Sequence, residues 1–143
     1  MQMTYSQNGL HLTEQFESCR LVAYLDGKGV PTIAWGHTAG VQLGDTCTQA
    51  QADGWLQRDI GWAEATVNRY VTTEVTQGEF DALVDFVFNC GTGNFQHSTL
   101  LALVDQGRFA EAADEFCKWD RAGGTIVAGL LRRRLAEKQE FNT

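Results

Sequence analysis

The stretch EQFESCRLVAYLDGKGVPTIAWGH, residues 14–37, contains the pattern that decides the fold. It holds two runs rich in β-forming side chains, residues 21–25 and residues 32–35. The residues between these runs are typical of turns: Asp26, Gly27, Gly29 and Pro31. This segment therefore predicts a small hairpin or a three-stranded sheet.

Helical patterns occupy most of the remaining sequence. Apolar residues at helical spacing, Leu12, Phe16 and Cys19, predict a first helix over residues 9–20. Thr48 and Ser98 are expected helix N-caps, and Thr76-Gln77-Gly78-Glu79 has the form of a capping box. The other expected helices are residues 48–70, a helix from Thr76 to the break at Gly91, Gly93 and Asn94, and residues 98–103, 108–119 and 125–139.

This order of elements predicts an α+β fold with two lobes. The expected small lobe covers residues of about 20–50, a linking helix residues 48–70, and a helical lobe residues 71–143. We expect one catalytic domain over residues 1–143, with the active site in a cleft between the lobes. Such a cleft is a natural place for an extended ligand.

Composition excludes several classes of protein. The formal charge of −7 argues against nucleic acid as a general partner. The first twelve residues, MQMTYSQNGLHL, lack the basic and apolar regions of a signal peptide, and the longest apolar runs are too short to span a bilayer. We therefore expect a product that is made and kept in the cytoplasm without stable membrane insertion.

The four cysteines, Cys19, Cys47, Cys90 and Cys117, are separated by 28, 43 and 27 positions. These gaps match no zinc-ligand spacing, so no metal site is expected. Free, mostly buried thiols are the default in a cytoplasmic product. The alternative is a disulfide that forms after release from the cell.

Glu17, Asp26 and Thr32 are the candidate catalytic group. A hairpin that folds back beside the first helix can bring them to one side of a cleft, and paired carboxyl groups perform glycoside hydrolysis. Glu17 lies near a helix C-terminus, which disfavours negative charge, whereas Asp26 on a solvated turn should stay ionised. On spacing alone, two solvated surface carboxylates are the more common explanation.

The same segment resembles the active-site segment of the phage-type lysozymes, glycoside hydrolase family 24. That family has a catalytic Glu, an Asp nine residues later, a Thr six further on, and then Gly-His. The chain matches at Glu17, Asp26, Thr32, Gly36 and His37. FDALVDFVFNCGTGNFQHSTLL, residues 80–101, and AGGTIVAGLLRRRLAE, residues 122–137, also resemble the family, so the similarity spans roughly residues 10–141.

The resemblance implies an endolysin that hydrolyses the β-1,4 bond between N-acetylmuramic acid and N-acetylglucosamine in peptidoglycan, with inversion. Glu17 would be the general acid, and Asp26 and Thr32 would position and activate a water. No metal or cofactor is implied. We expect a monomer that waits in the host cytoplasm, is released by a separate membrane-permeabilising protein, and lyses the host by attacking the wall in the periplasm.

Three further residues are carried over as supporting or substrate-binding: His37, Asn89 and Arg132. His37 would brace the cleft through a carboxylate, or would simply close the hairpin as a structural residue. Asn89 would hydrogen-bond the sugar. Arg132 would pair with Glu17. The alternative for the run from Arg132 to Arg134 is a solvated helix face, whose remaining arginines could contact an anionic wall.

The tryptophans are expected to lie mainly in the core. Trp35 could stack on a sugar or pack in the small lobe, and packing is favoured; Trp55, Trp62 and Trp119 are expected to be buried. Two other classes of function compete with an enzyme. One is a non-catalytic wall-binding module on the same fold, and the other is a generic helical interaction protein. The intact spacing of the candidate catalytic group argues against the binding module, and the family resemblance across nearly the whole chain argues against the interaction protein.

Overall fold

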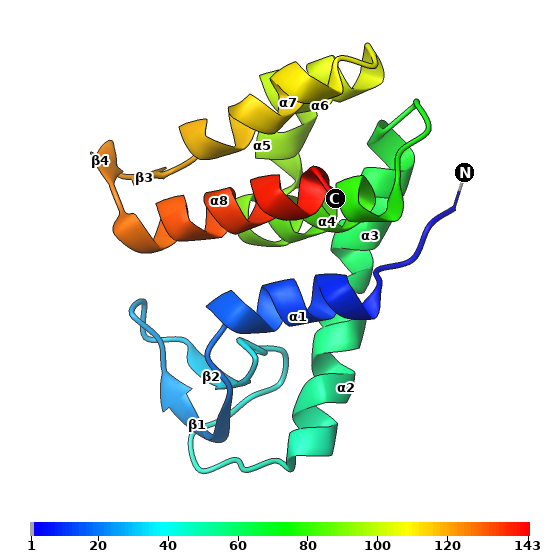
Figure 1. The fold of residues 1–143 in the computed structure, drawn as a ribbon. Helices are drawn as coiled ribbons and strands as arrows, with labels where there is room; N and C mark the ends of the chain where they lie inside the picture. Colours follow the sequence, from blue (N-terminus) through cyan, green and yellow to red (C-terminus); the bar gives the residue numbers. More distant parts are fainter. Residues whose placement is uncertain (1) are drawn as a thin grey trace. The chain divides into compact units, whose positions relative to one another are not determined.

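The computed structural model describes residues 2–143, and helices make up most of it (Figure 1). The elements follow in this order: α1 Gln7–Phe16, β1 Arg20–Leu25, β2 Pro31–Ala34, α2 Gln49–Asp59, α3 Gly61–Tyr70, α4 Gln77–Cys90, α5 Thr92–Gln96, α6 Thr99–Asp105, α7 Phe109–Glu115, the 3-10 turn η1 Phe116–Lys118, β3 Arg121–Ala122, β4 Thr125–Ile126 and α8 Ala128–Phe141. This confirms the predicted α+β class.

The chain forms two compact units. The hairpin unit is Thr13–Gly61, and the helical unit combines residues 2–12 with Trp62–Thr143. In the hairpin unit β1 and β2 pair antiparallel, with Tyr24 opposite Thr32. Further bridges join Val22 to Thr46 and Ile33 to His37. The sheet therefore has two strands rather than three.

The core of the hairpin unit is small. It is centred on the buried side chains of Ile33, Ala34 and Ala52, so β2 packs against α2. Cys19 and Trp35 pack against this cluster, as predicted for Trp35. Cys19 reaches the core from extended chain, however, because α1 ends at Phe16 and not at residue 20.

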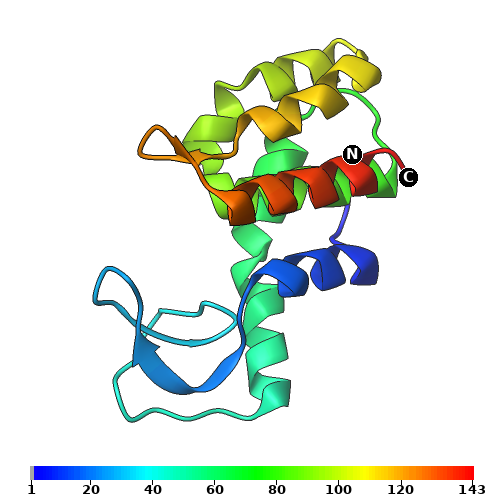
Figure 2. The same cartoon turned by 60° about the vertical axis from the view of Figure 1, so that its left-hand side comes forward.

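The helical unit is built around α4 and α8, which lie side by side (Figure 2). Its core contains buried phenylalanines that meet edge to face, with ring centroids 5.9 Å apart for Phe86 and Phe116, and 5.4 Å for Phe116 and Phe141. The predicted capping box of α4 is present, because the Thr76 side chain accepts from the Glu79 N–H and the Glu79 side chain accepts from the Thr76 N–H.

Several predicted boundaries are wrong, and each has a local cause. The helix expected over 48–70 is two helices, because Ile60 forms a turn just before Gly61, a poor helix former. Ser98 caps α6 as predicted, but that helix continues to Asp105. The helix expected over 108–119 ends at Glu115 in a 3-10 turn.

The helix expected over 125–139 begins only at Ala128. Before it, β3 and β4 form a short hairpin around Gly123 and Gly124, which have φ of 58° and 81°. This left-handed backbone is open to glycine and is the conformation of tight hairpin turns. The break expected at residues 91, 93 and 94 occurs only at Gly91, and the other two residues lie inside α5.

Candidate active site

Glu17 is the first residue after α1. Its N–H still donates to the Thr13 carbonyl at 3.0 Å, so the last helical turn fixes its backbone. The side chain is half-buried. Oε2 of Glu17 lies 3.6 Å from the position that a Cβ atom at Gly36 would occupy. The loop after β2 therefore closely approaches the carboxyl group.

That loop has unusual backbone geometry. Ala34 has φ of 58° and Gly36 has φ of 84°, while Ile33 and His37 exchange two backbone hydrogen bonds of 2.8 and 2.9 Å across it. A left-handed alanine is uncommon and costs about 1–2 kcal/mol. Strained positions of this kind are frequent at functional sites, where the surrounding structure enforces them.

Asp26 is held at the tip of the β1–β2 hairpin. Its Oδ1 accepts from the N–H groups of Val30 and Lys28, both at 2.8 Å. These two bonds, first that of Val30 and then that of Lys28, stabilise the charged form and hold the pKa of Asp26 below its usual value. The expectation that Asp26 stays ionised agrees with this direction.

Thr32 lies on β2 and is 4% exposed. Its hydroxyl donates to the Val30 carbonyl at 2.9 Å, and the same carbonyl accepts from the Asp26 N–H at 3.0 Å. Val30 therefore contacts both residues through its backbone, with its N–H on the Asp26 carboxylate and its carbonyl on the Thr32 hydroxyl. A single peptide segment thus fixes two of the three predicted catalytic residues.

His37 has a defined place in the hairpin unit. Its Nδ1 lies 2.7 Å from Oδ2 of Asp59 on α2, and its ring stacks on Trp55 with centroids 4.9 Å apart. The backbone of His37 closes the loop to Ile33, which is the structural role that the sequence left open. The histidine also contacts a carboxylate, as expected, but this is Asp59, which the sequence gave no reason to choose.

Asn89 and Arg132 belong to the helical unit. The pairing of Arg132 with Glu17 and the hydrogen bond of Asn89 to the sugar stay predictions. Asn89 is exposed at the last turn of α4, and its Oδ1 accepts from Nη2 of Arg134 at 2.8 Å. Arg132 is exposed on α8, and within residues 2–143 no ion pair involves it. Its exposed position leaves its side chain open to solvent.

The other two arginines of the run correct the sequence interpretation, because they are buried rather than solvated. Arg133 makes a two-pronged ion pair with Asp85, in which Nε and Nη2 both lie 2.9 Å from the carboxylate oxygens. Arg134 is 0% exposed and pairs with Glu137, with 2.6 Å between Nε and Oε1. Neither guanidinium is available to an anionic wall.

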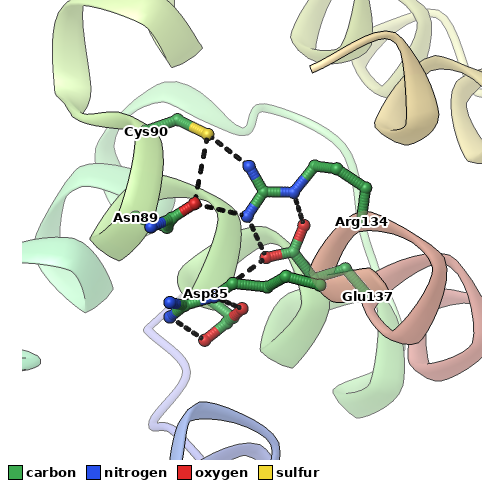
Figure 3. Close-up of polar contacts among 6 residues, drawn as sticks. Asp85, Asn89, Cys90, Arg134 and Glu137 are labelled. Carbon is green, nitrogen blue, oxygen red and sulfur yellow. Dashed lines mark hydrogen bonds and ion pairs between the residues drawn. The ribbon is translucent and has the colours of Figure 1, made fainter. Parts of the chain in front are cut away.

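Figure 3 shows how this buried group extends to the surface. The Arg134 guanidinium contacts Glu137 on one side and Asn89 and Cys90 on the other. Burial, followed by the proximity of Asp85, raises the pKa of Glu137 well above its usual value, and the arginines oppose this shift. The network thus links the core of the helical unit to the exposed amide of Asn89.

The remaining expectations concern cysteines, metals and membranes. All four cysteines are free, half-buried thiols, and burial raises the pKa of Cys47 and of Cys90. Among residues 2–143, His, Cys, Asp and Glu side chains form no group of three that could hold a metal ion. In that same part of the chain, none of the helices combines the length and apolar character needed to cross a bilayer.

The chain is similar to endolysins of several phages. The chain is 38% identical to an endolysin of Acyrthosiphon pisum secondary endosymbiont phage 1, over 99% of each sequence. It is 35% identical to the endolysin of Salmonella phage P22, covering 92% of the chain and 94% of that protein. It also matches an endolysin of Bacillus phage PZA at 40% identity but spans only 56% of that longer protein.

Solved structures give the same result. The muramidase domain of SpmX from Asticcacaulis excentricus superposes with a TM-score of 0.91 and 37% identity, covering 98% of both chains. A mutant of the P22 lysozyme superposes with a TM-score of 0.92 and 34% identity, covering 99% of both. A sequence profile described as phage lysozyme matches residues 14–137. The chain therefore belongs to the phage lysozyme family, whose members are lysozyme-type glycoside hydrolases.

Proposed function

We propose that this protein hydrolyses the β-1,4 bond between N-acetylmuramic acid and N-acetylglucosamine in peptidoglycan, with inversion at the anomeric carbon. The observation that carries the proposal is the clamping of Asp26 and Thr32 by the backbone of Val30, in the same unit that holds Glu17 beside Gly36. Two carboxyl groups in different surroundings suit an acid and a base.

The roles follow from the contacts. Glu17 gives its proton to the leaving glycosidic oxygen, while a water attacks the anomeric carbon from the opposite face. Oδ1 of Asp26 accepts from two N–H donors, so Oδ2 is the oxygen that accepts the proton of the water. Because the Thr32 hydroxyl uses its hydrogen on Val30, its oxygen accepts from that water and orients it.

Loss of turbidity of purified peptidoglycan tests the proposal. We expect Glu17→Gln and Asp26→Asn each to lower the clearing rate at least 100-fold, as expected for the removal of an essential acid or base. Glu14→Gln, which changes another half-buried carboxyl group of α1, is the matched control and should clear normally. Clearing by Glu17→Gln at the wild-type rate would overturn the acid, and anomeric analysis of early products tests inversion.

The lowered pKa of Asp26 predicts the acid side of the pH profile. Since two backbone N–H groups stabilise the charged form, the base stays ionised to lower pH than an ordinary aspartate. The acid limb of kcat/KM should therefore lie below pH 4. An acid limb near pH 6 would show that a different group limits the reaction.

We propose in addition that the protein acts outside the cytoplasm in which it is made. It would wait in the host cytoplasm as a monomer and reach the wall in the periplasm once a separate protein permeabilises the inner membrane. Expression alone should then leave cells intact, whereas expression followed by chemical permeabilisation of the membrane should lyse them. Rapid lysis on expression alone would contradict the need for a second protein.

A further inference from the structure

Trp62, at the start of α3, differs from every other aromatic side chain in residues 2–143. It is 45% exposed, whereas the others are buried or half-buried. The sequence predicted it to be a core residue, and the structure corrects this.

The ring is held by its neighbours. It lies against Phe88 of α4, with centroids 6.0 Å apart and an interplanar angle of 30°. One turn further along α3, the Thr66 hydroxyl lies 3.0 Å from both the Trp62 carbonyl and the Thr92 hydroxyl, so α3 is tied to α5 beside the ring. A side chain that is fixed in advance loses less conformational entropy when a ligand binds.

A hydrogen-bonding group lies at the same end of α4. Asn89 directly follows Phe88 and is exposed, and the buried Arg134 holds its Oδ1 at 2.8 Å. Because the oxygen faces Arg134, the amide nitrogen faces away from it, and within residues 2–143 this nitrogen donates no hydrogen bond. The Trp62 ring on α3 therefore lies against the last turn of α4, and that turn also carries an anchored donor.

This combination favours a sugar over a protein partner. The exposed part of Trp62 is about 110 Å², from 45% of a side-chain area of about 250 Å². A stable dimer needs about 800 Å² on each partner. An N-acetylhexosamine has one apolar face about the size of an indole ring, and its hydroxyl and acetamido groups accept hydrogen bonds.

We propose that Trp62 is a binding residue for the glycan, on which one N-acetylhexosamine ring stacks. A contact of the Asn89 amide with the sugar is already implied by the family resemblance, and Trp62 adds a stacking surface to it. The choice of a glycan as the ligand rests on the proposed function. Trp62 takes no part in bond cleavage and has its effect on substrate affinity. It is therefore expected to change KM more than kcat.

Calorimetric titration with a soluble β-1,4 hexamer of N-acetylglucosamine tests the site. The titrations use protein carrying Glu17→Gln, so that the oligomer is not cleaved. Adding Trp62→Ala should weaken binding at least tenfold, because stacking covers most of the exposed ring. Trp62→Phe should retain most of the affinity, and Leu135→Ala, which truncates a 50% exposed side chain on α8, should leave it unchanged.

The outcomes separate this site from the proposed chemistry. Equal affinity for Trp62→Ala and Leu135→Ala, or no binding of the hexamer by the parent protein, would overturn the site even if wild type clears peptidoglycan. At least tenfold weaker binding by Trp62→Ala would support it even if wild type clears nothing. Circular dichroism of each variant verifies folding. If the alanine variant is unfolded, Trp62→Gln, which also removes the aromatic face, takes its place and should show the same loss of affinity.

Discussion

Replacement of Arg134 by methionine should destabilise the helical unit by about 3–5 kcal/mol, the usual cost of removing one partner from a buried ion pair. The guanidinium is 0% exposed and lies 2.6 and 2.9 Å from the two oxygens of Glu137, which is itself 0% exposed. Methionine preserves much of the apolar stem of arginine. The loss is therefore mainly electrostatic, because the Glu137 carboxylate keeps only Arg133, at 4.0 Å.

Arg132→Met is the matched control, since it makes the same change one residue earlier on an exposed side chain. It should alter stability by less than about 0.5 kcal/mol. Urea unfolding followed by circular dichroism measures both variants. With a slope of about 2 kcal/mol per molar urea, a loss of 4 kcal/mol lowers the midpoint by about 2 M.

A second variant separates loss of the pair from loss of packing. Arg134→Met combined with Glu137→Leu removes the unpaired carboxylate, so the double variant should be more stable than Arg134→Met alone. The uncompensated carboxyl group of Arg134→Met can also take up a proton, so its loss should be smaller at pH 5 than at pH 8. A loss below about 1 kcal/mol at pH 8, equal to that of Arg132→Met, would refute the reasoning.

Three further predictions follow from single contacts. The raised pKa of Glu137 means that the folded protein keeps a proton that the unfolded chain releases near pH 4.5. The free energy of unfolding should therefore fall as pH rises from there through the folded pKa. A Glu137→Gln variant with an unchanged slope of urea midpoint against pH would contradict this. Gly36→Ala should cost about 1–2 kcal/mol, because Gly36 has φ of 84°, and a thermal melt equal to wild type would argue against that backbone strain. Asp59→Ala should lower the free energy of unfolding by about 1.5–3 kcal/mol, because it removes the hydrogen bond to His37. In urea unfolding Asp59→Asn should lie closer to wild type, and equal losses for the two variants would assign the effect to something other than this bond.

Local sequence signals predicted local structure well. The turn residues around Asp26 predicted the β1–β2 hairpin, and the Thr-x-x-Glu pattern at Thr76 predicted the start of α4, because each signal acts through bonds within a few residues. The hairpin of β3 and β4 was missed although Gly123-Gly124 is a turn signal. Strands of two residues are too short to show an alternating pattern.

The contacts that could not be predicted join residues far apart in the sequence. Asp59 follows His37 by 22 positions, and Arg133 follows its partner Asp85 by 48. A single sequence shows that a side chain is charged but does not show its partner. The default expectation for a charged residue is therefore that it lies in solvent. Trp62 illustrates the opposite error, because an aromatic residue in a helical pattern is more often buried than exposed.

The three consecutive arginines of α8 comprise one exposed side chain and two buried ones. Successive residues of a helix point about 100° apart, so Arg132, Arg133 and Arg134 cannot share one environment. Arg132 is exposed, while the other two form separate buried pairs with Asp85 and with Glu137. Arg134 also donates to the oxygen of Asn89. The buried charge on α8 therefore contacts an exposed amide at the end of α4. Substitution of Arg134 should therefore affect the surface that Asn89 presents as well as the stability of the core, whereas substitution of Arg132 should affect neither.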